Sequence, residues 1–248
     1  MVVIAINVGF NDSVEAVRAY RKQLGITMPI VFDDGSLGAA FHLRVTPTHI
    51  VIGRDGRIRY VSHLADQQLD AALMAARALT AQGTPSAATA NSDLAPIGVG
   101  DLLPMLSVRT LDGPRFELRG STARQTLTVL VFLSPWCESY LAATRPDASA
   151  TCRSTREQFS ALGGDPRMRW LGIASGLWAN SQDLRQYRTQ YKVTIPLTLD
   201  ASGQVFRAFR VNEVPTVLIA DAGGRIVRRI EGSAAQDGAA LRTVIDSL

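Results

Sequence analysis

Two cysteines are the residues of this 248-residue chain that could carry redox chemistry. Cys137 stands in the run Trp136-Cys137-Glu138-Ser139-Tyr140, directly after the apolar run 127–133 and at a point where we expect a helix to begin. Unpaired backbone N–H groups and the dipole at a helix N-terminus favour an anion, so this position predicts a lowered thiol pKa. The resulting thiolate is the nucleophile of thiol-disulfide exchange.

Glu138 has the opposite effect on the same thiol. A neighbouring carboxylate disfavours a second negative charge, so it opposes ionisation of Cys137. The sequence therefore leaves the net pKa of Cys137 open. An inert cysteine, kept as a small buried residue, is the alternative to a reactive one.

Cys152 is the candidate resolving cysteine, provided that the chain can bring it to Cys137. A continuous helix between them would hold their Cα atoms about 22 Å apart, whereas a disulfide needs about 4.4–6.8 Å. Pro146 offers a break, because proline removes an intrahelical hydrogen bond and disfavours helix at the preceding residue. A sharp break would allow pairing, and a mild kink would leave Cys152 as a packing residue.

Composition narrows the class of protein. Hydrophobic residues make up 46% and charged residues 19%, which is typical of a globular chain. The 26 basic and 22 acidic residues form no long run of one sign, so we predict no nucleic-acid partner. The three histidines lack metal-ligand spacing, and we predict no metal or other cofactor. No segment approaches the ~20 apolar residues of a membrane helix.

Two segments, 17–61 and 184–230, repeat each other with an offset of about 167 residues. The matched pairs are Tyr20 with Tyr187, Pro29 with Pro196, Asp33 with Asp200, Phe41 with Phe209, Pro47 with Pro215, and Thr48 with Thr216. A period of this length is far too long for a solenoid. It indicates duplication of a domain.

The two copies are not equally complete. Both predict a strand, a helix and a later pair of strands, at 2–8, 14–24, 49–53 and 57–62 in the first copy and at 168–174, 184–191, 216–220 and 225–231 in the second. Only the second predicts a hairpin over 105–118 and a buried central strand over 127–133. The first copy would therefore leave one sheet edge and one face without a partner. An upstream part of the domain, the second copy or self-association could cover them, and we expect the first of these.

The second copy resembles the TlpA/ResA-type branch of the thioredoxin superfamily. The resemblance covers about 97–248 and rests on Gly100-Asp101-x-x-Pro104, Leu111-Asp112-Gly113, Trp136-Cys137-Glu138 and Val214-Pro215-Thr216. Residues 2–63 look like the C-terminal part of the same domain, with Thr46-Pro47-Thr48 as the matching loop. The resemblance implies an α/β fold of two thioredoxin-like units, with a central mixed β-sheet flanked by helices and the first unit incomplete. The implied boundaries are 1–80, a linker at 81–99, and 100–248.

The same resemblance implies a function. The branch consists of exported bacterial thiol-disulfide oxidoreductases, so the implied partners are protein thiols or disulfides, or a small thiol, and the implied location is periplasmic or otherwise extracytoplasmic. Residues 1–12, however, are not typical of a signal peptide. Trp136, Glu138, Val214 and Pro215 would form the substrate loop around Cys137, with a cis peptide before Pro215.

One departure from the family pattern changes the expected chemistry. The family has Trp-Cys-x-x-Cys, and here Tyr140 stands at the second cysteine. The ordinary dithiol cycle cannot run at this motif, which leaves a single-cysteine mechanism or the distant Cys152.

Two other functions compete with an oxidoreductase. A peroxiredoxin-like peroxidase would use a single reactive cysteine, but Leu130 and Ser134 occupy the proline and threonine positions of the usual Pro-x-x-x-Thr-x-x-Cys signature. A non-enzymatic binding module is the other alternative, because the first unit has no redox motif. The oxidoreductase is the function that we expect.

Overall fold

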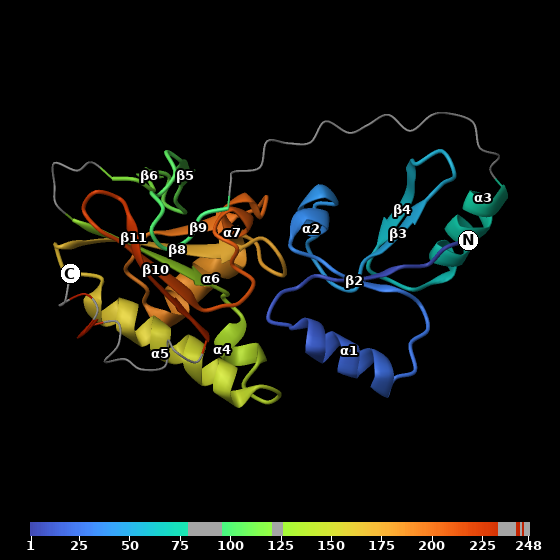
Figure 1. The fold of residues 1–248 in the computed structure, drawn as a ribbon, viewed down its shortest axis with the longest axis horizontal. Coiled ribbons are helices and arrows are strands. Elements are labelled where there is room, and N and C mark those ends of the chain that lie inside the picture. The colour runs from blue at the N-terminus through green and yellow to red at the C-terminus, as the bar shows by residue number, and fades with distance from the viewer. Residues whose placement is uncertain (79–95, 121–125, 233–241, 244, 246–248) are drawn as a thin grey trace.

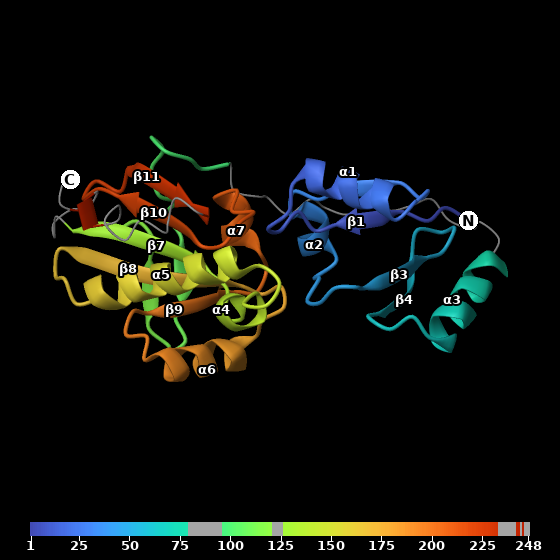
Figure 2. The ribbon, with the colours of Figure 1, turned by 90° about the horizontal axis from the view of Figure 1, so that it is seen from below.

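The computed structural model describes residues 1–78, 96–120, 126–232, 242, 243 and 245. Residues 1–78 form the first unit and 96–232 the second unit, and the two lie side by side as separate lobes (Figures 1 and 2). Most of the expected linker, 81–99, falls outside the described residues. Its last part belongs to the second unit, because the Ile97 N–H donates to the carbonyl of Ala208 at 2.8 Å.

The second unit is built around a five-stranded sheet with the order β11-β10-β7-β8-β9. Strand β7 (Leu127–Leu133) lies at its centre and pairs in parallel with β8 (Met168–Ser175), which pairs in parallel with β9 (Leu197–Asp200). On the other side β10 (Thr216–Ala220) runs antiparallel to β7, and β11 (Ile226–Glu231) closes the edge. The expected α/β fold with a central mixed sheet is therefore confirmed.

Strand β7 is apolar throughout because both of its faces are buried. Val129, Val131 and Leu133 point into one hydrophobic cluster, and Leu130 and Phe132 point into another. This is the alternation that a pleated strand imposes on its side chains. Covered on both sides, the strand is a rigid support for the residues that follow it.

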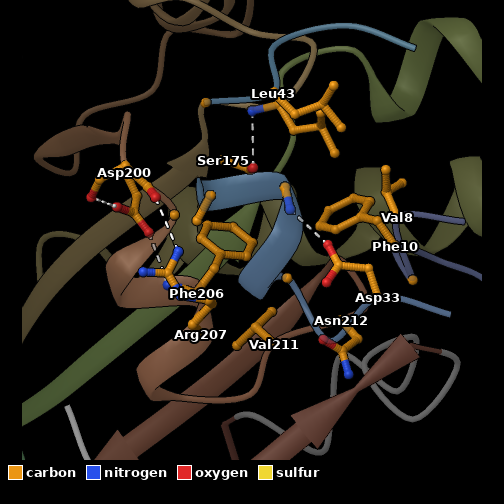
Figure 3. Close-up of a pocket in the computed structure, with 18 of the residues that line it drawn as sticks. Val8, Phe10, Asp33, Leu43, Ser175, Asp200, Phe206, Arg207, Val211 and Asn212 are labelled. Atoms are coloured by element: carbon orange, nitrogen blue, oxygen red, sulfur yellow. Dashed lines mark hydrogen bonds between the residues drawn. The ribbon is translucent and has the colours of Figure 1, made fainter. Parts of the chain in front are cut away.

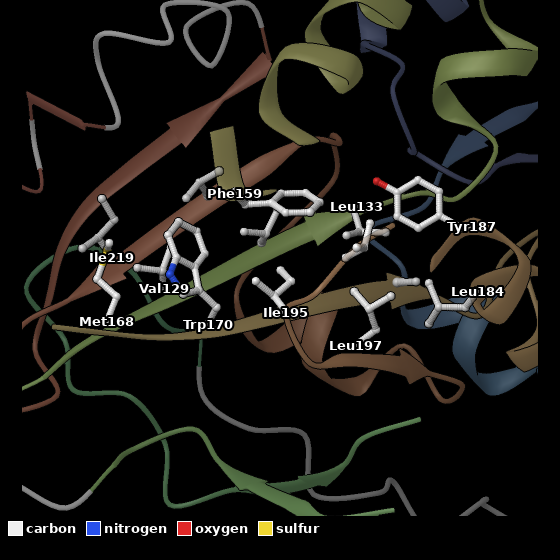
Figure 4. Packing of buried hydrophobic residues seen from close by; sticks show 14 of the residues in the cluster. Val129, Leu133, Phe159, Met168, Trp170, Leu184, Tyr187, Ile195, Leu197 and Ile219 are labelled. Atoms are coloured by element: carbon white, nitrogen blue, oxygen red, sulfur yellow. The ribbon is translucent and has the colours of Figure 1, made fainter. Parts of the chain in front are cut away.

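Helices cover the first of these faces. Helix α5 (Pro146–Leu162) contributes Phe159, and α6 (Ser181–Tyr191) contributes Leu184 and Tyr187. Figure 4 shows these side chains packed over the sheet together with Trp170 of β8. The position of α5 against the sheet therefore depends on this apolar cluster.

The opposite face is covered by shorter elements. These are helix α7 (Gln204–Ala208) and the hairpin of β5 (Ser107–Arg109) and β6 (Arg115–Glu117). Phe206 and Phe209 both contact Phe132 of β7, with ring centroids 5.0 and 5.7 Å away.

A short helix separates β7 from α5. Helix α4 (Cys137–Tyr140) begins where the sequence predicts it but has only four residues. Helix α5 then starts with Pro146 in its first turn, a position where a missing N–H costs nothing. The helix is therefore interrupted between the two cysteines, which is one of the two outcomes expected for Pro146.

The first unit has three helices, α1 (Val14–Gln23), α2 (Ser36–Ala40) and α3 (Gln67–Ala78), and two separate strand pairs. Strand β1 (Ala5–Asn7) runs parallel to β2 (Ile30–Phe32), as β8 runs to β9. Strand β3 (His49–Ile52) runs antiparallel to β4 (Ile58–Ser62), as β10 runs to β11.

Within residues 1–78 no strand joins β1 to β3, so this unit has no counterpart of β7. Apolar side chains such as Val2, Ile4, Ile52 and Val61 are exposed as a result. The missing neighbour also explains why β1 is shorter than the strand expected over 2–8, since residues outside 5–7 have no ladder partner.

Replacing Phe159 by alanine tests the role of the cluster that holds α5. This side chain is 1% exposed, so Phe159→Ala should lower the free energy of unfolding by about 3–5 kcal/mol in urea denaturation. Arg153→Ala, at an exposed position of the same helix, should change it by no more than about 0.5 kcal/mol. A loss below about 1 kcal/mol for Phe159→Ala would show that the cluster does not anchor the helix.

Candidate functional site

Cys137 and Cys152 form a disulfide in the structure. Their Cα atoms lie 6.2 Å apart, because the break before Pro146 lets α5 run back past α4. The alternative in which a mild kink keeps the sulfurs apart is therefore wrong. The partner of Cys137 is the distant cysteine, and Tyr140, at the family's second cysteine position, is 75% exposed.

The disulfide lies beneath the surface. Cys137 is fully buried and Cys152 is 9% exposed, and both pack against Leu141, Trp136 and Ala148. The sulfur of Cys137 lies 3.9 Å from the carbonyl oxygen of Ala148. Of the two residues, Cys152 is the more exposed.

The helix start at Cys137 is confirmed, but its electrostatic effect is small. A macrodipole is the sum of aligned peptide dipoles, and α4 supplies only four residues.

Glu138 does not act as the open carboxylate that the sequence led us to expect. Its side chain is 5% exposed, and it accepts two hydrogen bonds from Arg156, at 2.7 Å from Nε and 3.1 Å from Nη2. The guanidinium balances the carboxylate charge, which removes most of its opposition to a thiolate at Cys137. The negative charge of Glu138, the residue next to Cys137, is thus already balanced by Arg156.

The ion pair also changes the ionisation of the groups around it. Burial alone would lower the pKa of Arg156, but the hydrogen bonds and charge of Glu138 outweigh it and raise that pKa above its usual value. Burial, reinforced by the negative charge of Glu138, raises the pKa of Tyr187 well above its usual range. Arg156 therefore stays charged and Tyr187 stays neutral at physiological pH.

Three bonds connect α4 to α5. Beside the disulfide and the Glu138–Arg156 pair, the Ser149 hydroxyl donates to the backbone carbonyl of Glu138 at 2.7 Å. Ser149, Cys152 and Arg156 lie three and four residues apart, so they share one face of α5. That spacing is a signal in the sequence for Arg156 and Ser149, which the sequence analysis missed.

The loop before β10 meets the disulfide region in a groove. The Val214–Pro215 peptide is cis, as the family resemblance implies. Val214 lines a groove of about 510 Å³ together with Leu141 and Ala148, two residues that pack against the disulfide. A residue of the proline-bearing loop and two residues that pack against the disulfide therefore line one groove.

Trp136 connects the disulfide region to the first unit. Its ring meets Tyr140 and Trp178 edge to face, with centroids 5.9 and 5.6 Å away. Trp178 in turn donates from Nε1 to Thr46 of the first unit at 3.0 Å. Asn11 of the first unit also reaches the groove, and no signal in the sequence pointed to it.

The described parts of the chain offer neither a metal site nor a membrane span. No group of three or more histidine, cysteine, aspartate or glutamate side chains is placed there to hold a metal ion. No helix in those parts is long and apolar enough to cross a bilayer.

No protein-family model matches the sequence, and no curated protein matches it. Solved structures do. A secreted disulfide oxidoreductase of Mycobacterium tuberculosis, homologous to E. coli DsbE, is 22% identical with a TM-score of 0.44, and the match covers 58% of this chain and 96% of that chain. StoA from Bacillus subtilis is 19% identical with a TM-score of 0.41, and the match covers 57% of this chain and 96% of that chain. A putative thioredoxin from Neisseria meningitidis is 19% identical with a TM-score of 0.46, and the match covers 58% of this chain and 87% of that chain. The function proposed below rests on the geometry of the site.

Breaking the Glu138–Arg156 pair on one side should be costly. Glu138→Gln leaves a buried guanidinium without its counter-charge, so the free energy of unfolding should fall by about 3–5 kcal/mol. The double variant Glu138→Gln/Arg156→Met should recover at least half of that loss, as measured by a double-mutant cycle in urea. A double variant as unstable as the sum of the two single ones would show that the side chains act independently.

Proposed function

We propose that this protein is a thiol-disulfide oxidoreductase whose redox group is the Cys137–Cys152 disulfide. The observation that carries the proposal is the position of this disulfide after the central strand β7, packed against Leu141 and Ala148, which line a groove together with Val214 of the loop before β10. The substrates are thiols or disulfides of polypeptides, or a small thiol. No cofactor is needed, because the two sulfurs accept and return the electrons themselves.

The oxidising direction takes two exchange steps. A substrate thiolate attacks the sulfur of Cys152, forms a mixed disulfide with it, and releases Cys137 as a thiolate that takes up a proton. A second substrate thiolate then attacks the substrate sulfur of the mixed disulfide and releases Cys152. Two substrate thiols become one disulfide, and the two electrons end on Cys137 and Cys152 as thiols.

Reversibility requires that the two thiols stay close after reduction. The Glu138–Arg156 pair and the Ser149 hydrogen bond join α4 to α5 without using either sulfur. They hold Cys137 and Cys152 in position, which keeps their effective concentration high. The disulfide can therefore form again without a conformational rearrangement that brings the two thiols together.

The same proposal covers the organisation of the chain and its location. Residues 1–80 would be the C-terminal part of a second thioredoxin-like domain, joined by the linker 81–99 to a complete domain at 100–248. Matching strand pairs support this, as do register shifts at equivalent points, between Val51 and Ile52 and between Ile219 and Ala220. A paired disulfide fits an oxidising compartment, so we place the protein outside the cytoplasm.

The alternatives have less support at this site. A peroxidase of the peroxiredoxin type has a proline where this chain has Leu130, and Leu130 is a buried residue within β7. A binding module would keep the disulfide only as a staple between α4 and α5. Redox cycling distinguishes the two functions: the disulfide of an oxidoreductase is reduced and formed again in the folded protein, whereas a purely structural disulfide is not.

Single-cysteine variants test which sulfur meets the substrate. With Cys137→Ser the remaining Cys152 thiol should react with a chromogenic aromatic disulfide at least several-fold faster than the Cys137 thiol left by Cys152→Ser, because Cys137 is fully buried. The rates are followed by the release of the aromatic thiolate.

The wild-type chain is the control for this experiment. Dithiothreitol should open its disulfide to two thiols, and oxidised glutathione should close it again. A disulfide that dithiothreitol reduces only after the chain unfolds would rule out the oxidoreductase. The disulfide would then have a structural role only. Faster reaction of Cys137 would reverse the order of attack.

A further inference from the structure

We propose that the first unit occupies the substrate position of the disulfide site, with the side chain of Asn11 in the place of a substrate backbone carbonyl. The inference rests on the proposed function and adds a regulatory contact to it. A polypeptide substrate must displace Asn11 before it can pair with the loop beside the disulfide, whereas a small thiol need not.

The contact lies on residues 212–214, in the loop that leads to Pro215. The backbone N–H of Val214 donates to Oδ1 of Asn11 at 3.0 Å, and the N–H of Asn11 donates to the carbonyl of Asn212 at 2.7 Å. Because Asn11 bonds to both, the carbonyl of Asn212 and the N–H of Val214 face the same side of this loop. They are the groups to which an added peptide strand would bind. Asn11 occupies both.

A second contact of the same kind shows that this docking is built into both units. Trp178, the equivalent of Asn11, donates its N–H to the carbonyl of Arg44 at 2.7 Å and its Nε1 to the hydroxyl of Thr46 at 3.0 Å. Thr46 precedes Pro47 as Val214 precedes Pro215. Each unit thus covers the proline-bearing loop of the other, which is the arrangement of an isologous interface.

Backbone conformation supports the same equivalence. Asn11 and Trp178 both have positive φ, at 54° and 60°. Asparagine tolerates this region better than most residues, whereas for a bulky tryptophan it is an outlier. Both positions therefore keep a conformation that their contacts across the interface help to hold.

Apolar and charged contacts surround the hydrogen bonds. Phe10 packs against Trp178 and Phe206 of the second unit, with ring centroids 5.8 and 6.2 Å away. Arg145, just before α5, donates to the carbonyl of Asn11 at 3.2 Å and lies 3.8 Å from Asp12. Asn11 is therefore held from three directions.

A small cavity of about 90 Å³ lies at the same interface (Figure 3). Equivalent residues of the two units line it, among them Asp33 with Asp200 and Leu43 with Val211. Each aspartate accepts backbone N–H groups at the start of its own short helix, Asp33 from Leu37 and Asp200 from Phe206. These carboxylates stabilise the interface loops, whereas Asn11 lines the groove near the disulfide together with Asp12, Ser13 and Ala16.

Three variants of the full chain test the role of Asn11. Asn11→Gly removes the acceptor and tolerates positive φ. Asn11→Asp keeps an oxygen acceptor and should behave like the wild type. Thr46→Val removes the matching hydrogen bond on the opposite side of the interface, where no cysteine lies, and is the control for general loosening.

The rate of mixed-disulfide formation is the first readout, measured by mass spectrometry after acid quench. The probes are a seven-residue peptide with one central cysteine and 2-mercaptoethanol, which has no peptide backbone. Asn11→Gly should react with the peptide about three- to tenfold faster than the wild type, the size of one lost hydrogen bond. Its rate with 2-mercaptoethanol should stay within about twofold, and Thr46→Val should leave both rates within about twofold. Equal acceleration by both variants, or none by Asn11→Gly, would overturn the proposal.

Amide hydrogen exchange at Val214 is the second readout and needs no redox activity. Its N–H should exchange at least about fivefold faster in Asn11→Gly than in the wild type or Asn11→Asp. Unchanged exchange would overturn the inference. Failure of both thiols to open the disulfide in every variant, with faster exchange at Val214, would instead overturn the proposed function and leave the contact intact.

Discussion

The break that Pro146 makes after α4 is the constraint on which the redox site depends. Helix α5 could not begin one turn earlier without a clash between the proline ring and the preceding carbonyl, so the chain reverses and brings Cys152 back to Cys137. The same reversal places Arg156 against Glu138. A buried carboxylate beside a thiol would be unfavourable alone, but one helix face supplies both the partner sulfur and the counter-charge.

Much of this arrangement could be predicted from the sequence because it is local. The apolar run of β7, the helix start at Cys137 and the break at Pro146 follow from hydrophobic pattern and proline geometry. Whether the break is sharp could not be predicted, since it depends on how Phe159 packs α5 against the sheet. Phe159 lies seven residues beyond Cys152, and its burial fixes α5 against the sheet.

The contacts between the units could not be predicted, for a different physical reason. Hydrogen bonds such as those from Val214 to Asn11 and from Trp178 to Thr46 join residues more than a hundred positions apart, and no periodicity marks them. The repeat did make Thr46 equivalent to Val214, whereas Asn11 and Trp178 lie just before the repeated segments. It carried no information that these two pairs would meet across one interface.

The first unit has the same kinds of strand pairing as the second unit, one parallel and one antiparallel, but without a strand between them. It has no counterpart of β7, so β1 and β3 belong to separate sheets and much apolar surface is exposed. Its contacts with the second unit come from the segments 8–12 and 33–46 instead of from those open edges. The loop at Thr46 has no cysteine to serve in its own unit, yet it accepts the indole N–H of Trp178, whose ring lies against Trp136 beside the disulfide. The proline-bearing loop of each unit therefore takes part in the contact with the other unit, Thr46 through Trp178 and Val214 through Asn11.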